Sequence, residues 1–153
     1  MKFKLKIQLL SLALVLCLLF SSNVYAEGPS QIIINSVVAE IPADMGSIKE
    51  FSGRTFVPVR FLLEYFNYSV SWDEEDRIVF GRNLLGDVFV MQVGSPFLTV
   101  REDGKKSENI TMDVEPVLIA EEGRTYVPIR FLAQAIGYTV GYDDATGTVM
   151  LDR

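Results

Sequence analysis

The sequence predicts an α+β fold of two tandem-duplicated, β-rich halves, each with mostly antiparallel strands around one short helix. The main observation is an internal repeat. The string GRTFVPVRFL, which begins at Gly53, recurs as GRTYVPIRFL from Gly123. In addition, each copy changes from a β-branched and aromatic triplet to apolar residues at helical spacing, and then to a hairpin pattern. These observations predict a strand, a helix and a hairpin in the same order, twice.

Each copy of the string predicts a short strand that leads into a short helix. The triplets Thr-Phe-Val and Thr-Tyr-Val suit a strand. Pro58 and Pro128 follow them, and proline fits the first turn of a helix, where its missing N–H would have no partner. We expect about ten helical residues in each copy, ending at residues that tolerate the left-handed conformation, Asn67 and Gly137.

The remaining strands are expected upstream of each string and in a hairpin after each helix. Upstream strands are predicted at residues 32–34, 37–41, 88–93 and 97–100, and hairpin turns at 73–76 and 143–147. The internal repeats then span about 31–81 and 88–152. Each half has only about 50 to 60 residues and no disulfide, so we expect the two to form one cooperative domain.

The N-terminus predicts a secretory signal peptide at residues 1–26. Three early lysines precede an apolar run at 9–20, and Val24 and Ala26 supply small residues for cleavage after Ala26. The run is shorter than the roughly 20 residues of a membrane anchor. We therefore expect residues 27–153 to be secreted, extracellular or wall-associated, with no membrane span after cleavage. Cleavage also removes Cys17, the only cysteine.

The composition excludes several classes of function. The 153 residues include no histidine, which excludes His-ligated copper or zinc sites and Ser-His-Asp triads. There are 14 Lys and Arg against 20 Asp and Glu, and a net charge of −6 does not suit a nucleic-acid backbone. We predict no catalytic residue, no cofactor, no metal and no nucleic-acid partner.

The repeated string, followed by Val-x-(Trp/Tyr)-Asp, resembles the copper amine oxidase N-terminal domain family, also called stalk domains. The motif appears twice, and the likeness covers roughly residues 32–151. The resemblance implies a non-catalytic module of exported cell-surface proteins of Gram-positive-type bacteria. It implies neither copper nor amine oxidation, because that chemistry belongs to a separate, larger domain with three His ligands.

Charged residues within the motif have two interpretations. Arg60 and Arg130 suit either an anion receptor or a structural role in which each guanidinium pairs with an acid, Asp73 or Asp143. We favour the structural role. The acidic runs from these aspartates are interpreted as solvated hairpin turns rather than as calcium or glycosidase sites. The predicted fold-motif residues are Arg54, Pro58, Arg60, Asp73, Arg124, Pro128, Arg130 and Asp143.

Four aromatic residues form the candidate ligand surface: Tyr68, Trp72, Tyr138 and Tyr142. One hypothesis is that they cover the helices from the sheet side, and the other is that they bind a sugar or wall polymer. The predicted function is a non-catalytic secreted or cell-surface binding or scaffolding module of the bacterial envelope. Its partner would be a cell-wall polymer or another exported protein.

Two alternatives stay open. One is a small secreted hydrolase that acts on wall polymers with carboxylates alone. The other is a secreted inhibitor or partner of another exported protein. In that case, exposed edge strands of this chain would pair with the other protein and extend its sheet.

Overall fold

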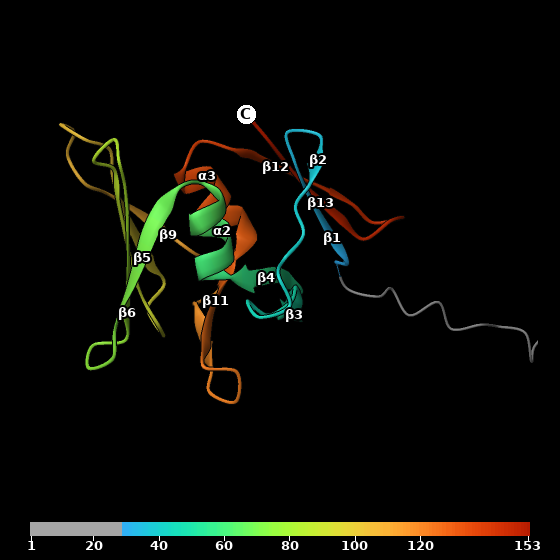
Figure 1. Ribbon diagram of the computed structural model, residues 1–153, viewed down its shortest axis with the longest axis horizontal. Coiled ribbons are helices and arrows are strands. Elements are labelled where there is room, and N and C mark those ends of the chain that lie inside the picture. The colour runs from blue at the N-terminus through green and yellow to red at the C-terminus, as the bar shows by residue number, and fades with distance from the viewer. Residues whose placement is uncertain (1–28) are drawn as a thin grey trace, which may run out of the picture.

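The structure is a computed structural model that describes residues 29–153, so the predicted signal peptide lies outside the described residues. Strands make up 46% of the described residues and helices 11%. They form three sheets and two short helices, and Figure 1 shows the helices between two of the sheets.

We name the sheets by their connections. The mixed sheet has the order β12-β13-β1-β2, the central sheet β10-β11-β4-β3, and the meander β5-β6-β7-β8-β9. The mixed sheet contains β1 (Gln31–Ile34), β2 (Val37–Val38), β12 (Thr139–Asp143) and β13 (Thr148–Asp152). The central sheet contains β3 (Lys49–Phe51), β4 (Arg54–Pro58), β10 (Val117–Ile119) and β11 (Arg124–Pro128). The meander contains β5 (Tyr68–Asp73), β6 (Ile78–Asn83), β7 (Val88–Gln92), β8 (Phe97–Arg101) and β9 (Glu108–Thr111).

The predicted fold class is wrong. The chain is mostly β, and it is not an α+β arrangement of two halves, because every sheet combines strands from both predicted repeats. The first strand, β1, pairs in parallel with the last, β13. In the meander, β6 pairs with β7 across the boundary between the repeats. A segment of about 50 to 60 residues buries a smaller share of its surface than a larger domain does and is marginally stable alone. In this chain, strands of one repeat complete sheets begun by the other.

The central sheet is organised around an antiparallel pair of equivalent strands. β4 and β11 pair with Val57 opposite Val127, Pro58 opposite Tyr126 and Phe56 opposite Pro128. Val57 and Val127 hold the same place in the two copies of the string and are fully buried. A local twofold axis therefore passes between these two valines and relates the elements on either side.

The helices α2 (Val59–Tyr65) and α3 (Ile129–Ala135) have seven residues each, fewer than predicted. Pro58 and Pro128 are each the last residue of a strand and precede the helix, rather than lying within its first turn. Their φ angles of −58° and −60° suit both the strand and the helix start, which lets the chain pass directly from one to the other.

The helices end where the sequence predicts a left-handed residue. Asn67 has φ of 62° and Gly137 has φ of 86°. After α3, the N–H of Gly137 donates to the carbonyl of Gln134, and the N–H of Tyr138 donates to that of Ala133, at 3.0 and 2.9 Å. This is the Schellman pattern, which satisfies carbonyls that a helix end would leave without partners. The predicted caps are confirmed.

The core lies where the helices meet all three sheets. α2 packs against β5 and β11, whereas α3 packs against β12 and β4, so each helix also contacts the strand of the other copy. Leu62 of α2 and Leu132 of α3 are fully buried in this core. Within residues 29–153, no helix has the length and apolar character that a membrane crossing needs.

The shared sheets predict that neither repeat folds alone. Fragments 27–84 and 85–153 would each lose the partners of their central and outer strands, so we expect neither to give dispersed NMR spectra or a cooperative melt. The intact chain 27–153 is the control and should give both. A cooperative melt from either fragment alone would contradict this prediction.

Charge at the core face of a helix should unfold the chain. Leu132→Asp places an unpaired carboxylate at a fully buried position, and we expect it to lower the free energy of unfolding by about 3 kcal/mol or more. Gln134→Asp introduces the same side chain at an exposed position of α3 and should cost less than about 1 kcal/mol. Urea denaturation of both variants measures the difference in the free energy of unfolding. Equal losses would contradict the assignment of Leu132 to the core face of α3.

Candidate functional site

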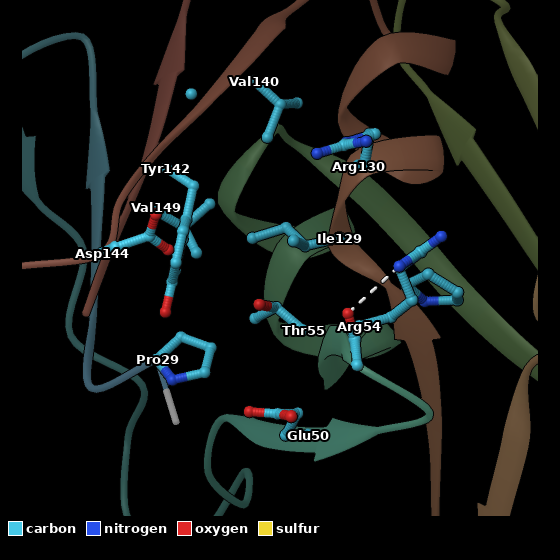
Figure 2. Close-up of a pocket in the computed structure, with 13 residues that line it drawn as sticks. Pro29, Glu50, Arg54, Thr55, Ile129, Arg130, Val140, Tyr142, Asp144 and Val149 are labelled. Carbon is cyan, nitrogen blue, oxygen red and sulfur yellow. Dashed lines mark hydrogen bonds between the residues drawn. The ribbon is translucent and has the colours of Figure 1, made fainter. Parts of the chain in front are cut away.

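Two clefts flank the central sheet. Cleft A has a volume of about 320 Å³ and lies between the central sheet, α3 and the mixed sheet (Figure 2). Its principal lining residues are Glu50, Thr55, Ile129, Arg130, Tyr142 and Asp144. Cleft B has a volume of about 520 Å³ and lies between the central sheet, α2 and the meander. Its principal lining residues are Val59, Arg60, Trp72, Glu74, Arg124 and Thr125.

Cleft A combines an apolar floor with a polar rim. Ile129 and Val149 are buried beneath it, whereas the Tyr142 side chain is 43% exposed. Figure 2 shows Tyr142 and Asp144 on one side of the cleft and Ile129 and Thr55 facing them. The floor follows from strand alternation, which directs alternate side chains of β13 and β12 toward the helices.

Two arginines border cleft A, and only one of them is free to meet a ligand. The Nε and Nη2 atoms of Arg54 donate to Oδ2 of Asp113 at 3.0 and 2.6 Å, and Figure 2 shows the Arg54 guanidinium turned away from the cleft. The hydrogen bond from Arg54 holds the pKa of Asp113 below its usual value. Arg130 also lines the cleft, is exposed, and forms no ion pair or side-chain hydrogen bond within residues 29–153.

Cleft B also contains an aromatic ring, carboxylates and guanidinium groups, and more of these form hydrogen bonds within the protein. The indole N–H of Trp72 donates to Oε2 of Glu74 at 2.7 Å, which fixes the ring beside an acid. Arg124 donates to the backbone carbonyls of Glu122 and Asp44 at 2.8 and 2.6 Å. This arginine therefore ties the segment before β3 to the turn before β11.

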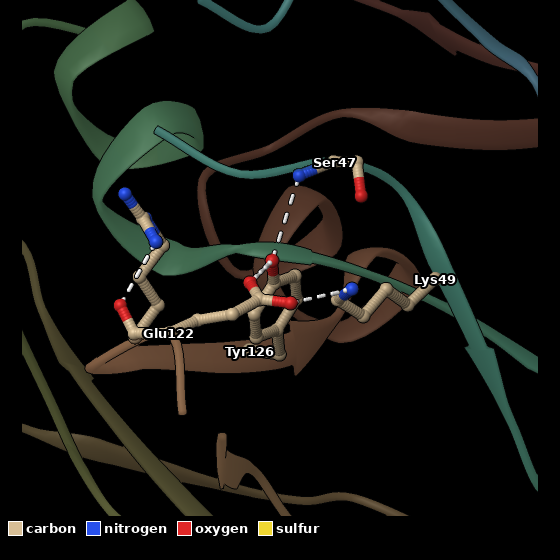
Figure 3. A network of polar contacts seen from close by, with 5 residues as sticks. Ser47, Lys49, Glu122 and Tyr126 are labelled. Atoms are coloured by element: carbon tan, nitrogen blue, oxygen red, sulfur yellow. Dashed lines mark hydrogen bonds and ion pairs between the residues drawn. The ribbon is translucent and has the colours of Figure 1, made fainter. Parts of the chain in front are cut away.

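A polar network lies next to cleft B (Figure 3). Tyr126 is fully buried, and its hydroxyl donates to Oε2 of Glu122 at 2.6 Å. The other oxygen of Glu122 accepts from Nζ of Lys49 at 2.7 Å, and the backbone N–H of Ser47 donates to the Tyr126 hydroxyl at 3.5 Å. The network joins the approach to β3 with β11 and so fixes one wall of cleft B.

The network shifts the titration of its members. The hydrogen bond from Lys49, and then that from Tyr126, lowers the pKa of Glu122 from its usual value. The same contact with Glu122 raises the pKa of Lys49. Burial, followed by the hydrogen bond to Glu122, raises the pKa of Tyr126. All three shifts favour the arrangement in which Lys49 and Glu122 are charged and Tyr126 is neutral.

The family model for the copper amine oxidase N-terminal domain matches residues 34–151 as one copy. The chain belongs to the copper amine oxidase N-terminal domain family. Comparisons with curated proteins and with solved structures gave no match. The family's domain is a non-catalytic, stalk-like domain. The clefts of this family member therefore have to be interpreted first as binding surfaces.

The four aromatic residues predicted as a ligand surface lie in three places. Tyr142 lines cleft A and Trp72 lines cleft B. Tyr68 is buried, and Tyr138 packs on the Phe66 ring with centroids 4.6 Å apart, at the end of the helices. Tyr68 and Tyr138 therefore lie together at the helix ends, where both also line a hollow of about 1000 Å³, and the other two residues face separate clefts.

The predicted pairing of motif arginines with motif aspartates does not occur among the described residues. Nε of Arg60 lies 3.8 Å from Oε1 of Glu64, on the same helix. Asp73 instead accepts the backbone N–H groups of Glu75 and Asp76, each at 3.0 Å.

Asp143 likewise serves its own hairpin turn. It accepts from the N–H of Ala145 and the hydroxyl of Thr146, each at 2.9 Å, and the Thr146 contact lowers the pKa of Asp143. An aspartate that starts a tight turn accepts hydrogen bonds from the turn's own N–H groups. Both motif aspartates are held in this way, and neither pairs with a motif arginine.

Several partners were missed because they are distant in sequence. Asp113 lies 59 residues after Arg54, and Asp44 lies 80 residues before Arg124. Neither belongs to the repeated string, so no local spacing predicts these contacts. The only available signal was that motif arginines need some acceptor.

The network predicts a pH-dependent contribution to stability. Because the pKa of Glu122 is lower in the folded chain, its carboxylate stabilises the fold above its unfolded pKa of about 4.3, and this is lost as pH falls through the folded value. Glu122→Gln should therefore destabilise the chain at pH 7, and its difference from wild type should shrink toward pH 3. Thermal melts over this pH range measure both.

The neighbouring exposed residue provides the control. Glu121→Gln removes the same charge one residue away, outside the Lys49 and Tyr126 contacts, and should stay within about 0.5 kcal/mol of wild type at neutral pH. Equal effects of Glu121→Gln and Glu122→Gln would mean that net charge, and not the network, sets the pH dependence.

Proposed function

We propose that this protein is an exported, non-catalytic binding module of the bacterial envelope whose partner is a wall polymer. The observation that carries the proposal is the presence of two open clefts, each with an aromatic ring, a guanidinium and a carboxylate around an aliphatic floor. Membership of a non-catalytic family supports binding rather than turnover. The signal-peptide pattern of residues 1–26 supports export to the envelope.

The geometry favours this function over a carboxylate-dependent hydrolase. A glycosidase acid needs a raised pKa in an apolar setting, opposite a second carboxylate. The motif aspartates instead accept turn N–H groups, and the pKa of Asp143 is lowered. Both aspartates therefore have the properties of turn caps.

The family motif offers an interpretation of the repeated string. We interpret the two copies of the string as two copies of the motif within one domain. Support comes from the pairing of β4 with β11 about their equivalent valines and from the matching caps after α2 and α3.

The function predicts association with the wall without turnover. Purified residues 27–153 should sediment with peptidoglycan sacculi and release no soluble sugar or peptide. Asp73→Asn and Asp143→Asn should still sediment, because these side chains cap hairpin turns and do not line the clefts. In fractionated native cells, the protein should appear in the wall or medium.

Three results would contradict the proposal. Release of wall fragments that either aspartate variant abolishes would establish the hydrolase instead. Retention of the protein in the cytoplasm would exclude export. A protein that leaves sacculi unbound but co-purifies stoichiometrically with another exported protein would establish the inhibitor or partner function.

A further inference from the structure

The two clefts are lined by equivalent positions of the two sequence repeats. Twelve of the 13 residues that line cleft A have a counterpart 70 residues away that lines cleft B, and only Pro29 has none. The equivalence holds across the aromatic, acidic and basic members: Tyr142 with Trp72, Asp144 with Glu74, and Arg130 with Arg60.

Each cleft takes residues from both copies of the string. Cleft A uses Arg54 and Thr55 of β4 together with Arg130 of α3, whereas cleft B uses the corresponding residues of β11 and α2. The cause is the antiparallel pairing at Val57 and Val127, which places the start of each strand beside the end of the other and beside the helix that follows. Neither copy alone can form a cleft.

The aromatic and acidic members Tyr142 and Asp144 keep their chemistry in cleft B, whereas Glu50 of cleft A corresponds to Ala120. Tyrosine in cleft A is replaced by tryptophan in cleft B, and aspartate by glutamate, so an aromatic ring and a carboxylate remain in both. Outside the clefts, equivalent positions change character: Tyr65 of α2 corresponds to Ala135 of α3, and Phe80 of β6 to Met150 of β13. Tyr142 is also 43% exposed, so part of its ring is open to a ligand in cleft A.

The lining defines the class of ligand. An aromatic ring and aliphatic floor suit an apolar ligand face, while carboxylate and guanidinium groups exchange hydrogen bonds with hydroxyls and amides. In cleft A the Arg54 guanidinium pairs with Asp113, which leaves Arg130 beside the carboxylates of Glu50 and Asp144. A polyanion would meet two carboxylates there and a polycation would meet the free guanidinium of Arg130, so we expect an uncharged ligand.

We propose that each cleft binds pyranose units of an uncharged glycan, so that one chain carries two equivalent glycan sites. Pyranose rings combine an apolar face of C–H groups with a rim of hydroxyls, which matches the floor and rim of each cleft. The proposal deepens the proposed function, on which it rests, by naming the ligand and the number of sites. Two sites on one chain raise the avidity for a repeating polymer.

Stoichiometry tests the proposal directly. The chain 27–153 is titrated by calorimetry and NMR with a soluble tetramer of β-1,4-linked N-acetylglucosamine, and we expect two sites per chain. Tyr142→Ala should leave the cleft B site only, and Trp72→Ala should leave the cleft A site only. The double variant should weaken binding by about tenfold or more.

Matched variants keep the test valid if Trp72→Ala unfolds the chain. Arg60→Gln and Arg130→Gln change exposed side chains of the two clefts and should each weaken one site. Tyr65→Ala removes a similarly exposed ring outside both clefts and should leave two sites unchanged. NMR shifts should map to β12 and α3 for one site and to β5 and α2 for the other.

The outcomes separate this inference from the proposed function. One site or none in the wild type, or stronger binding of a uronate or glucosamine oligomer, would overturn the inference. Sedimentation with sacculi without tetramer binding would overturn the inference and leave the proposed function standing. Two tetramer sites on a protein that is not exported would support the inference and refute the proposed envelope role.

Discussion

The pairing of β4 with β11 is the contact on which the rest of the structure depends. Val57 lies opposite Val127 with both side chains fully buried, so two equivalent strands run antiparallel through the centre of the chain. Each strand ends in a proline that leads directly into a helix, and each helix therefore packs on the strand of the other copy. The mixed sheet and the meander then cover the two sides of this centre, as Figure 1 shows. The core and both clefts follow from one pair of strands.

The two sides of the central sheet are fastened by different chemistry. Tyr126 is held by Glu122 and Lys49, whereas its counterpart Phe56 meets the Phe51 ring edge-on at 5.1 Å. A phenylalanine at the equivalent position cannot donate a hydrogen bond, and an aromatic contact replaces the ion pair there. The Tyr126 network therefore depends on pH through the Glu122 carboxylate, whereas the contact between Phe51 and Phe56 does not. The two copies differ in how they hold the sheet, while equivalent positions line the two clefts.

Features that depend on local sequence patterns, namely the helices and their caps, could be predicted from the sequence. The repeated string located both helices, and the positive φ angles of Asn67 and Gly137 confirm the predicted caps. Strand partners were not predictable, because alternation of side chains says which face a strand buries but not which strand lies beside it. The expectation of two halves failed for this reason: β1 pairs with β13, over 100 residues away. Likewise, the sequence predicted the rings of Trp72 and Tyr142 as candidates for ligand binding, but the clefts around them require the pairing of strands across the two copies.

Building each cleft from both copies couples binding to folding. The walls of cleft A come from the central and mixed sheets, so an occupant that touches Thr55 and Tyr142 joins elements that separate when the chain unfolds. A ligand that binds only the folded state at 100 times its dissociation constant stabilises it by about 2.7 kcal/mol per site. Two equivalent sites double this contribution. In a domain without a disulfide, whose copies depend on each other to complete every sheet, the proposed glycan would thus reinforce the same β4–β11 pairing that forms its binding sites.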